Sequence, residues 1–133
     1  MYRILLAVDQ SEERAEACAR AVTELPGDPE ELEVRILHSF TDNPEGASAS
    51  QVEAVRVARD YLDEHGVPYE IDESSGHPAD IVEQVADEMD ANLIVLAGRK
   101  RSPAGKAIFG SVTQEVILNT SHNVLVAGPG AGR

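Results

Sequence analysis

The feature that most constrains this sequence is a regular alternation of short apolar runs with amphipathic segments of helical period. The apolar runs are rich in branched residues, as expected of strands buried on both faces of a sheet. The predicted strands are residues 4–8, 32–40, 67–72, 92–97 and 123–127. Between consecutive runs, apolar residues recur every three or four positions, which predicts a helix in each interval.

This alternation predicts a single doubly wound α/β domain at residues 1–128, followed by a short tail at 129–133. Right-handed crossovers place helices on both faces of a five-stranded parallel sheet. We expect a flavodoxin-like arrangement with strand order 3-2-1-4-5. In that order the direction of winding reverses beside the first strand, so a crevice opens between the first and fourth strands at their carboxyl ends.

Local signals predict where the helices begin and end. Ser11 is expected to cap the first helix, Gly66 to end the second in a left-handed conformation, and Pro78 to lie in the first turn of the third. Cys18 is expected to be a buried small hydrophobe in the first helix. The residues predicted to form the inner face of the second helix are Val52, Val55, Arg59 and Leu62.

The charge and the length of the apolar runs exclude several classes of function. The chain has 24 acidic and 11 basic side chains and a net charge of −13, which disfavours binding to nucleic acid. No apolar run approaches the length of a transmembrane helix, so we expect a cytoplasmic protein without a membrane partner. The acidic, lysine-poor composition is also typical of proteins from salt-accumulating organisms.

The positive charge is concentrated after the fourth predicted strand. Four basic residues lie within eight positions there: Arg99, Lys100, Arg101 and Lys106. Gly98 lets the backbone turn directly after the strand, and Gly110 with Ser111 begins a helix whose first amides can bind an anion. Ser111 is expected either to donate its hydroxyl to a phosphate or to cap this helix. The segment therefore predicts an anion site.

Familiar catalytic and phosphate motifs are absent. A P-loop would need glycine at Lys100 and Ser or Thr at Ala107, and no G-x-G-x-x-G follows the first strand. The four histidines have no metal-site spacing, and no serine shows a catalytic triad signature. Three roles are open for Asp9: a base, a Mg²⁺ ligand, or a residue that forms the turn into the first helix. Because no further acid, base or metal-binding groups converge with it in the sequence, we predict no catalytic residue and no metal site.

Three segments of the chain resemble the universal stress protein family, and the resemblance covers essentially the whole sequence. They are Asp9 with Ser11, residues 76–81, and Gly98 with Gly110, Ser111 and Val112. The resemblance implies a fold of the adenine nucleotide alpha hydrolase type and a stress-response function. In the ATP-binding branch, a Gly-x-x-Gly is followed by nine residues and then Gly-Ser or Gly-Thr. This implies phosphate contacts from the loop and ribose or adenine contacts near Asp9 and Ser39.

The loop departs from that pattern at two points. Arg101 replaces the second glycine, and eight residues rather than nine separate it from Gly110. Gly105 is expected to supply a turn, while Arg99 and Arg101 are expected to replace lost amide donors. The resulting expectation is a regulatory protein, not an enzyme, that binds ATP, or AMP or ADP, with or without Mg²⁺.

The alternative is a stress-linked interaction protein that does not bind nucleotide. In both cases the resemblance implies a homodimer through residues 123–127. An exposed apolar edge strand of this kind favours pairing with a second copy.

Overall fold

The chain forms one parallel sheet of five strands in the order β3-β2-β1-β4-β5. The computed structural model describes residues 1–40, 49–98 and 110–128. The strands are β1 (Tyr2–Ala7), β2 (Leu32–Phe40), β3 (Tyr69–Ser75), β4 (Leu93–Ala97) and β5 (Val124–Ala127). The predicted fold class and the predicted strand order are both confirmed.

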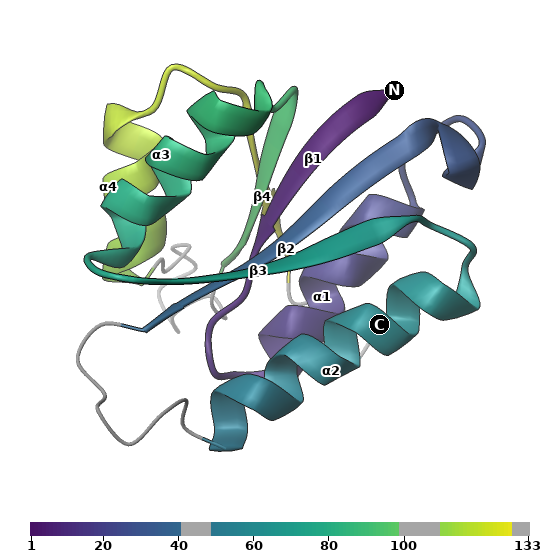
Figure 1. Cartoon of the computed structure of the whole chain (residues 1–133), viewed down its shortest axis with the longest axis horizontal. Coiled ribbons are helices and arrows are strands. Elements are labelled where there is room, and N and C mark those ends of the chain that lie inside the picture. The colour runs from purple at the N-terminus through teal and green to yellow at the C-terminus, as the bar shows by residue number, and fades with distance from the viewer. Residues whose placement is uncertain (41–48, 99–109, 129–133) are drawn as a thin grey trace, which may run out of the picture.

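The helices cover both faces of this sheet. They are α1 (Glu12–Thr23), α2 (Ala49–Glu64), α3 (Pro78–Met89) and α4 (Ser111–Asn119), with a short 3₁₀ turn, η1 (Pro29–Glu31), before β2. Figure 1 shows α1 and α2 on one side of the sheet and α3 and α4 on the other. Among the described residues, no helix combines the length and the apolar character needed to cross a bilayer.

The core consists of two apolar layers, one on each face of the sheet. Ile4 and Leu6 of β1 belong to the layer that includes Cys18 of α1 and Ala58 of α2. Leu5, which points to the other face, belongs to the layer beneath α3 and α4. Successive side chains of a strand point to opposite faces, so the continuous apolar run of β1 supplies both layers.

The local signals at helix ends are confirmed. Ser11 is the N-cap of α1, and its Oγ accepts a hydrogen bond from the Arg14 N–H at 3.2 Å. Pro78 is the first residue of α3. Gly66 has a φ of +73°, a left-handed conformation that glycine adopts without the steric cost other residues carry. These residues turn the chain so that each helix packs back onto the sheet.

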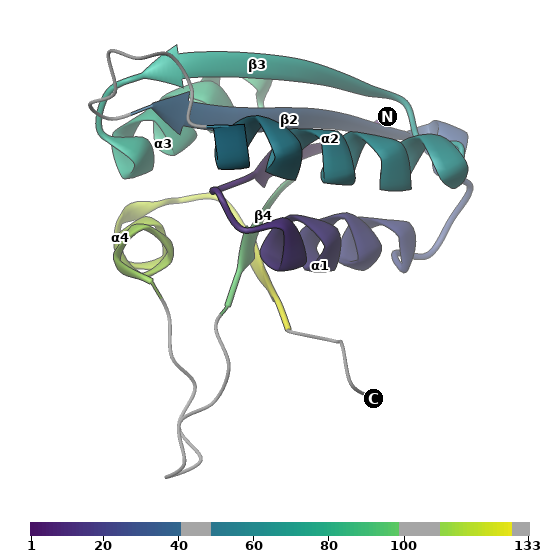
Figure 2. The same cartoon turned by 90° about the horizontal axis from the view of Figure 1, so that it is seen from below.

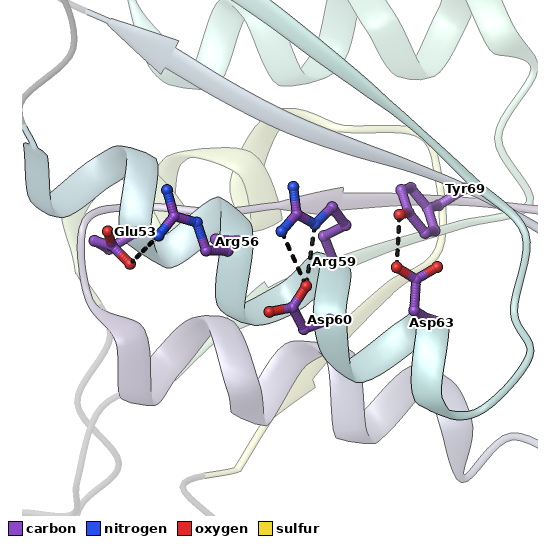
Figure 3. A network of polar contacts seen from close by, with 6 residues as sticks. All are labelled: Glu53, Arg56, Arg59, Asp60, Asp63 and Tyr69. Atoms are coloured by element: carbon purple, nitrogen blue, oxygen red, sulfur yellow. Dashed lines mark hydrogen bonds and ion pairs between the residues drawn. The ribbon is translucent and has the colours of Figure 1, made fainter.

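The prediction for the inner face of α2 is correct for Val55 and Leu62, which are buried, and wrong for Arg59; the side chain of Val52 lies outside the described part of the structure. Ala58 is fully buried, whereas Arg59 lies at the surface and its Nη2 is 3.0 Å from Asp60 Oδ1 (Figure 3). On the same surface the Tyr69 hydroxyl donates to Asp63 Oδ2 at 3.0 Å. Ala58 and Arg59 are adjacent, so the sequence pattern alone does not decide which of them faces the core. Packing against α1 favours the small side chain of Ala58.

Candidate functional site

The candidate site lies where β1 and β4 end side by side, at the edge formed by the carboxyl ends of the strands, here called the carboxyl edge. Ile4 is in register with Leu93, and Leu6 with Val95. From this edge the chain continues from β1 into α1 and from β4 toward α4, on opposite faces of the sheet. Figure 2 shows β4 between α1 and α4. This reversal is the topological switch point at which doubly wound proteins bind ligands.

Asp9 organises the turn that leads from β1 into α1. Its Oδ1 accepts the Ser11 N–H at 2.8 Å, and its Oδ2 accepts the Arg14 Nε–H at 2.8 Å. The expected turn-forming role of Asp9 is therefore confirmed. Its side chain is nevertheless about half exposed, at 49%. A carboxylate has about four lone-pair positions, so Asp9 retains capacity to accept a ligand hydroxyl.

The amino end of α4 lies at the carboxyl edge, next to the end of β4. Gly110 is the N-cap residue, and no side-chain hydrogen bond caps the helix within the described chain. Ser111 is the first helical residue and is exposed, so the expectation that it caps the helix is wrong. Val112 packs partly buried against the core and anchors this turn. The first amides and the positive end of the helix dipole are thus suited to an anion.

Thr113 holds this helix end against the sheet. It is buried, and its hydroxyl donates to the carbonyl oxygen of Ala97, the last residue of β4, at 3.1 Å. The Gly98 N–H donates to the Ala127 carbonyl of β5 at 3.0 Å. Both ends of the segment between β4 and α4 are therefore fixed at the same edge. Thr113 was not among the predicted site residues, although a hydroxyl within the apolar stripe of α4 is a signal for such a contact.

The remaining predicted residues fall in two groups. Ser39 lies near the end of β2 in register with Ser74 of β3, and β2 is the neighbour of β1, so its backbone also lies toward the carboxyl edge. Arg99, Arg101 and Gly105 lie outside the described residues. Their phosphate-binding roles stay predictions.

His77 links α3 to α4 beside this edge. It occupies the N-cap position of α3 without making a side-chain cap, and its Nε2 lies 2.9 Å from Glu115 Oε2 instead. The hydrogen bond and the negative charge of Glu115 raise the pKa of His77 above its usual value. His77 therefore lies at the start of α3, while its side chain connects α3 to α4.

A second histidine cluster, absent from the sequence-based predictions, lies at the opposite edge of the sheet. Glu83 and Asp87 of α3 and His122, which precedes β5, place one potential ligand atom each within 4.8 Å of the others. The spacing of Glu83 and Asp87 places both on one helical face and is visible in the sequence. His122 joins them only through the packing of α3 against the segment between α4 and β5.

Cys18 has the environment of a structural residue. Its side chain is buried in the layer beneath α1, and burial raises the pKa of its thiol to about 12. A nucleophilic cysteine needs a substantial fraction of thiolate at neutral pH. The expectation of a buried small hydrophobe is confirmed.

The sheet order and the glycine-initiated helix at the switch point define a doubly wound α/β protein, a class whose ligands bind at the carboxyl edge of the sheet. The universal stress protein family model matches residues 1–128, and the chain belongs to this family. The family membership predicted from Asp9, Gly98 and the Gly110 segment is therefore confirmed.

Individual relatives agree with this assignment. A universal stress protein from Mycolicibacterium smegmatis is 38% identical over 72 residues, which cover 52% of this chain and 54% of that protein. The match thus spans about half the length of this curated relative. A universal stress protein structure from Archaeoglobus fulgidus is 31% identical with a TM-score of 0.75, covering 96% of this chain and 98% of that one. A structure from the same organism in complex with dAMP is 26% identical with a TM-score of 0.70, at 96% and 98% coverage.

Proposed function

We propose that the protein is a cytoplasmic regulatory module of the stress response that binds an adenine nucleotide at the carboxyl edge. The nucleotide would lie between Asp9, the end of β2 near Ser39, and the segment from Gly98 to Ser111. The observation that carries this proposal is the position of α4. Its amino end, which no side chain of the described residues caps, is held by Thr113 at the end of β4, beside the switch point.

Phosphate is the chemical group that best matches this helix end. Backbone amides and the helix dipole favour an anion, and Gly110 lets the ligand approach without a side chain in the way. Four of the 11 basic residues of a chain with net charge −13 occur between Gly98 and Gly110. We assign phosphate contacts to Arg99, Arg101 and the amides of Ser111 and Val112, and a turn to Gly105.

The sugar and base are assigned to the other side of the crevice. Asp9 is oriented by Arg14 and retains lone pairs for a ribose hydroxyl, while Ser39 lies one strand further along the sheet. The dAMP complex of the Archaeoglobus fulgidus relative supports an adenine nucleotide as the ligand class. We propose ATP as the principal ligand, with AMP and ADP as alternatives. Any Mg²⁺ would be held chiefly by the phosphates, as is usual for this cation.

Regulation suits this edge better than catalysis. Asp9 accepts hydrogen bonds from the Ser11 amide and from Arg14. These contacts suit a carboxylate that positions a ligand better than one that acts as a general base. We therefore expect nucleotide hydrolysis to be slow and incidental.

The proposal is tested by calorimetry on protein stripped of ligand, with ATP, ADP and AMP, with and without Mg²⁺. Gly110→Asp should abolish or strongly weaken binding, because it places a carboxylate where a phosphate would sit. Asp is a favoured N-cap residue and the φ of −70° suits any residue, so this variant should fold. Gly110→Asn is the matched control, since it has nearly the same shape without the charge.

Binding at least tenfold weaker in Gly110→Asp than in Gly110→Asn would support a phosphate at this helix end. Equal affinity in the two variants would contradict it. No binding of any nucleotide to the wild type would favour the alternative, an interaction protein that does not bind nucleotide. Arg101 and the shortened spacing to Gly110 are the features that favour this alternative.

We also propose that the protein is a homodimer through β5. This strand lies at the end of the sheet, and Val124, Leu125 and Val126 are only partly buried in the single chain. No strand of the described residues pairs with the outer side of β5, and an apolar edge of this kind is suited to pairing with a second copy.

A further inference from the structure

Glu83, Asp87 and His122 form a compact cluster at the amino edge, the side of the sheet opposite the carboxyl edge. His122 is followed by Asn123 and β5, and the Asn123 carbonyl accepts the N–H of Ile94 in β4. One ligand atom from each of the three side chains lies within 4.8 Å of the others. We propose that this cluster binds one divalent transition metal ion, with Zn²⁺ the best match.

The orientation of His122 is that of a metal-binding imidazole. Its side chain is only 13% exposed, and its Nδ1 lies 3.0 Å from the Ala91 carbonyl oxygen. A carbonyl only accepts, so Nδ1 carries the hydrogen and Nε2 is directed at Asp87 Oδ1, 2.8 Å away. A ring N–H donated to a carbonyl or a carboxylate is the usual support of a zinc-binding histidine, because it fixes the tautomer.

Glu83 supplies an independent observation. Its Oε1 has less than 1 Å² of exposed surface and no hydrogen-bond partner among the described residues. An unpartnered carboxylate oxygen removed from water is costly, and a bound cation would offset that cost. Without metal, His122 can take a second proton and pair with Asp87, and the pKa of His122 is accordingly raised by its hydrogen bond to Asp87.

The three ligand atoms of the cluster determine which class of metal ion fits it. One imidazole nitrogen and two carboxylate oxygens suit Zn²⁺, whereas Mg²⁺ and Ca²⁺ prefer ligands that are all oxygen. Tetrahedral zinc with bonds of about 2.0–2.1 Å needs ligand atoms about 3.3 Å apart, within reach of small rotations of the two carboxylates. The fourth position would be taken by water. The ion would tie α3 to the segment between α4 and β5.

The chain contains a matched control for this site. His77, Asp80 and Glu115 also place three potential ligand atoms within 4.8 Å. However, the His77 side chain is 52% exposed, and no buried carboxylate oxygen without a partner occurs in this cluster. We therefore expect the two clusters to differ in zinc affinity although their composition is the same.

The test is calorimetry with Zn²⁺ on the full chain, freed of metal and carrying no histidine tag. The wild type should bind one tightly held ion, and an excess of Mg²⁺ should not displace it. His122→Asn and Glu83→Gln should each weaken binding at least tenfold, while His77→Asn should leave it unchanged. Glu83→Gln is the critical variant, because it removes a proposed ligand while Oε1 has no hydrogen bond to lose among the described residues, so the variant should stay folded.

Unchanged zinc affinity in folded His122→Asn or Glu83→Gln would overturn the proposal, as would an equal loss in His77→Asn or displacement by Mg²⁺. A change in the His122 ring nitrogen resonances on zinc addition would support it directly. Because the two sites lie at opposite edges of the sheet, this result is independent of nucleotide binding at Gly110.

Discussion

His77 shows how a single contact sets a measurable property. Its Nε2 lies 2.9 and 3.0 Å from the two oxygens of Glu115, and this hydrogen bond raises its pKa above 6.5. The folded pKa is above the unfolded value, so the contact stabilises the fold fully below about pH 6.5. That contribution is lost as the pH rises through the folded pKa.

We predict that Glu115→Gln lowers the pKa of His77 toward 6.5, because the amide supplies no negative charge. Proton NMR titration of the ring resonances measures this directly. His122 provides the internal control in the same spectra, since its main partner is Asp87 and its titration should not change. An unchanged titration of His77 would mean that Glu115 is not the cause.

At the scale of single elements, the cap of α1 is the contact most easily isolated. We predict that Ser11→Ala lowers the free energy of unfolding by about 1 kcal/mol, because the Arg14 N–H loses its acceptor. Ser11→Asp is the matched control and should retain most of the stability, since Asp is an equally good N-cap residue. Urea unfolding measures both, and an equal loss in the two variants would contradict the capping role.

The proposed dimer can be tested at the edge strand β5. The carbonyls of Asn123 and Ala127 accept hydrogen bonds from Ile94 of β4 and from Gly98 just after it. The alternate residues Val124 and Val126 therefore direct their backbone groups away from the sheet. Val126→Pro should therefore reduce dimer formation in light scattering while the protomer stays folded, because proline is tolerated where the N–H faces outward.

Leu125→Pro is the corresponding control, because it removes a hydrogen bond of the sheet itself and should destabilise the protomer. Detection of only monomer in the wild type would contradict the proposed homodimer. A dimer unaffected by Val126→Pro would place the interface elsewhere.

The helices and strands were more predictable from the sequence than the clusters of side chains that they bring together. Continuous branched runs such as residues 4–8 are characteristic of buried parallel strands, and the alternation with helices leaves few possible topologies. The prediction that Arg59 lies on the inner face of α2 was wrong, because the apolar pattern of the sequence does not decide whether Ala58 or Arg59 faces the core. Thr113 and the His122 cluster depend on contacts between elements distant in sequence, which periodicity does not reveal.

For the whole molecule, the net charge of −13 predicts a response to salt. Raising NaCl from about 0.01 to 0.15 M shortens the screening length from about 30 to 8 Å and weakens repulsion among the carboxylates. Exposed ion pairs such as Arg35 with Asp72 weaken too, but each contributes little. The urea midpoint should therefore rise over this range, and a fall would show that attractive pairs dominate.

The proposed nucleotide site at the carboxyl edge is tested most directly by an amide NMR footprint of ATP on ligand-free protein. The largest shifts should occur at Gly98, at Ser111 and Val112, and around Asp9, with little change at His122. Shifts confined to other surfaces, or none at any ATP concentration tested, would contradict the proposed site.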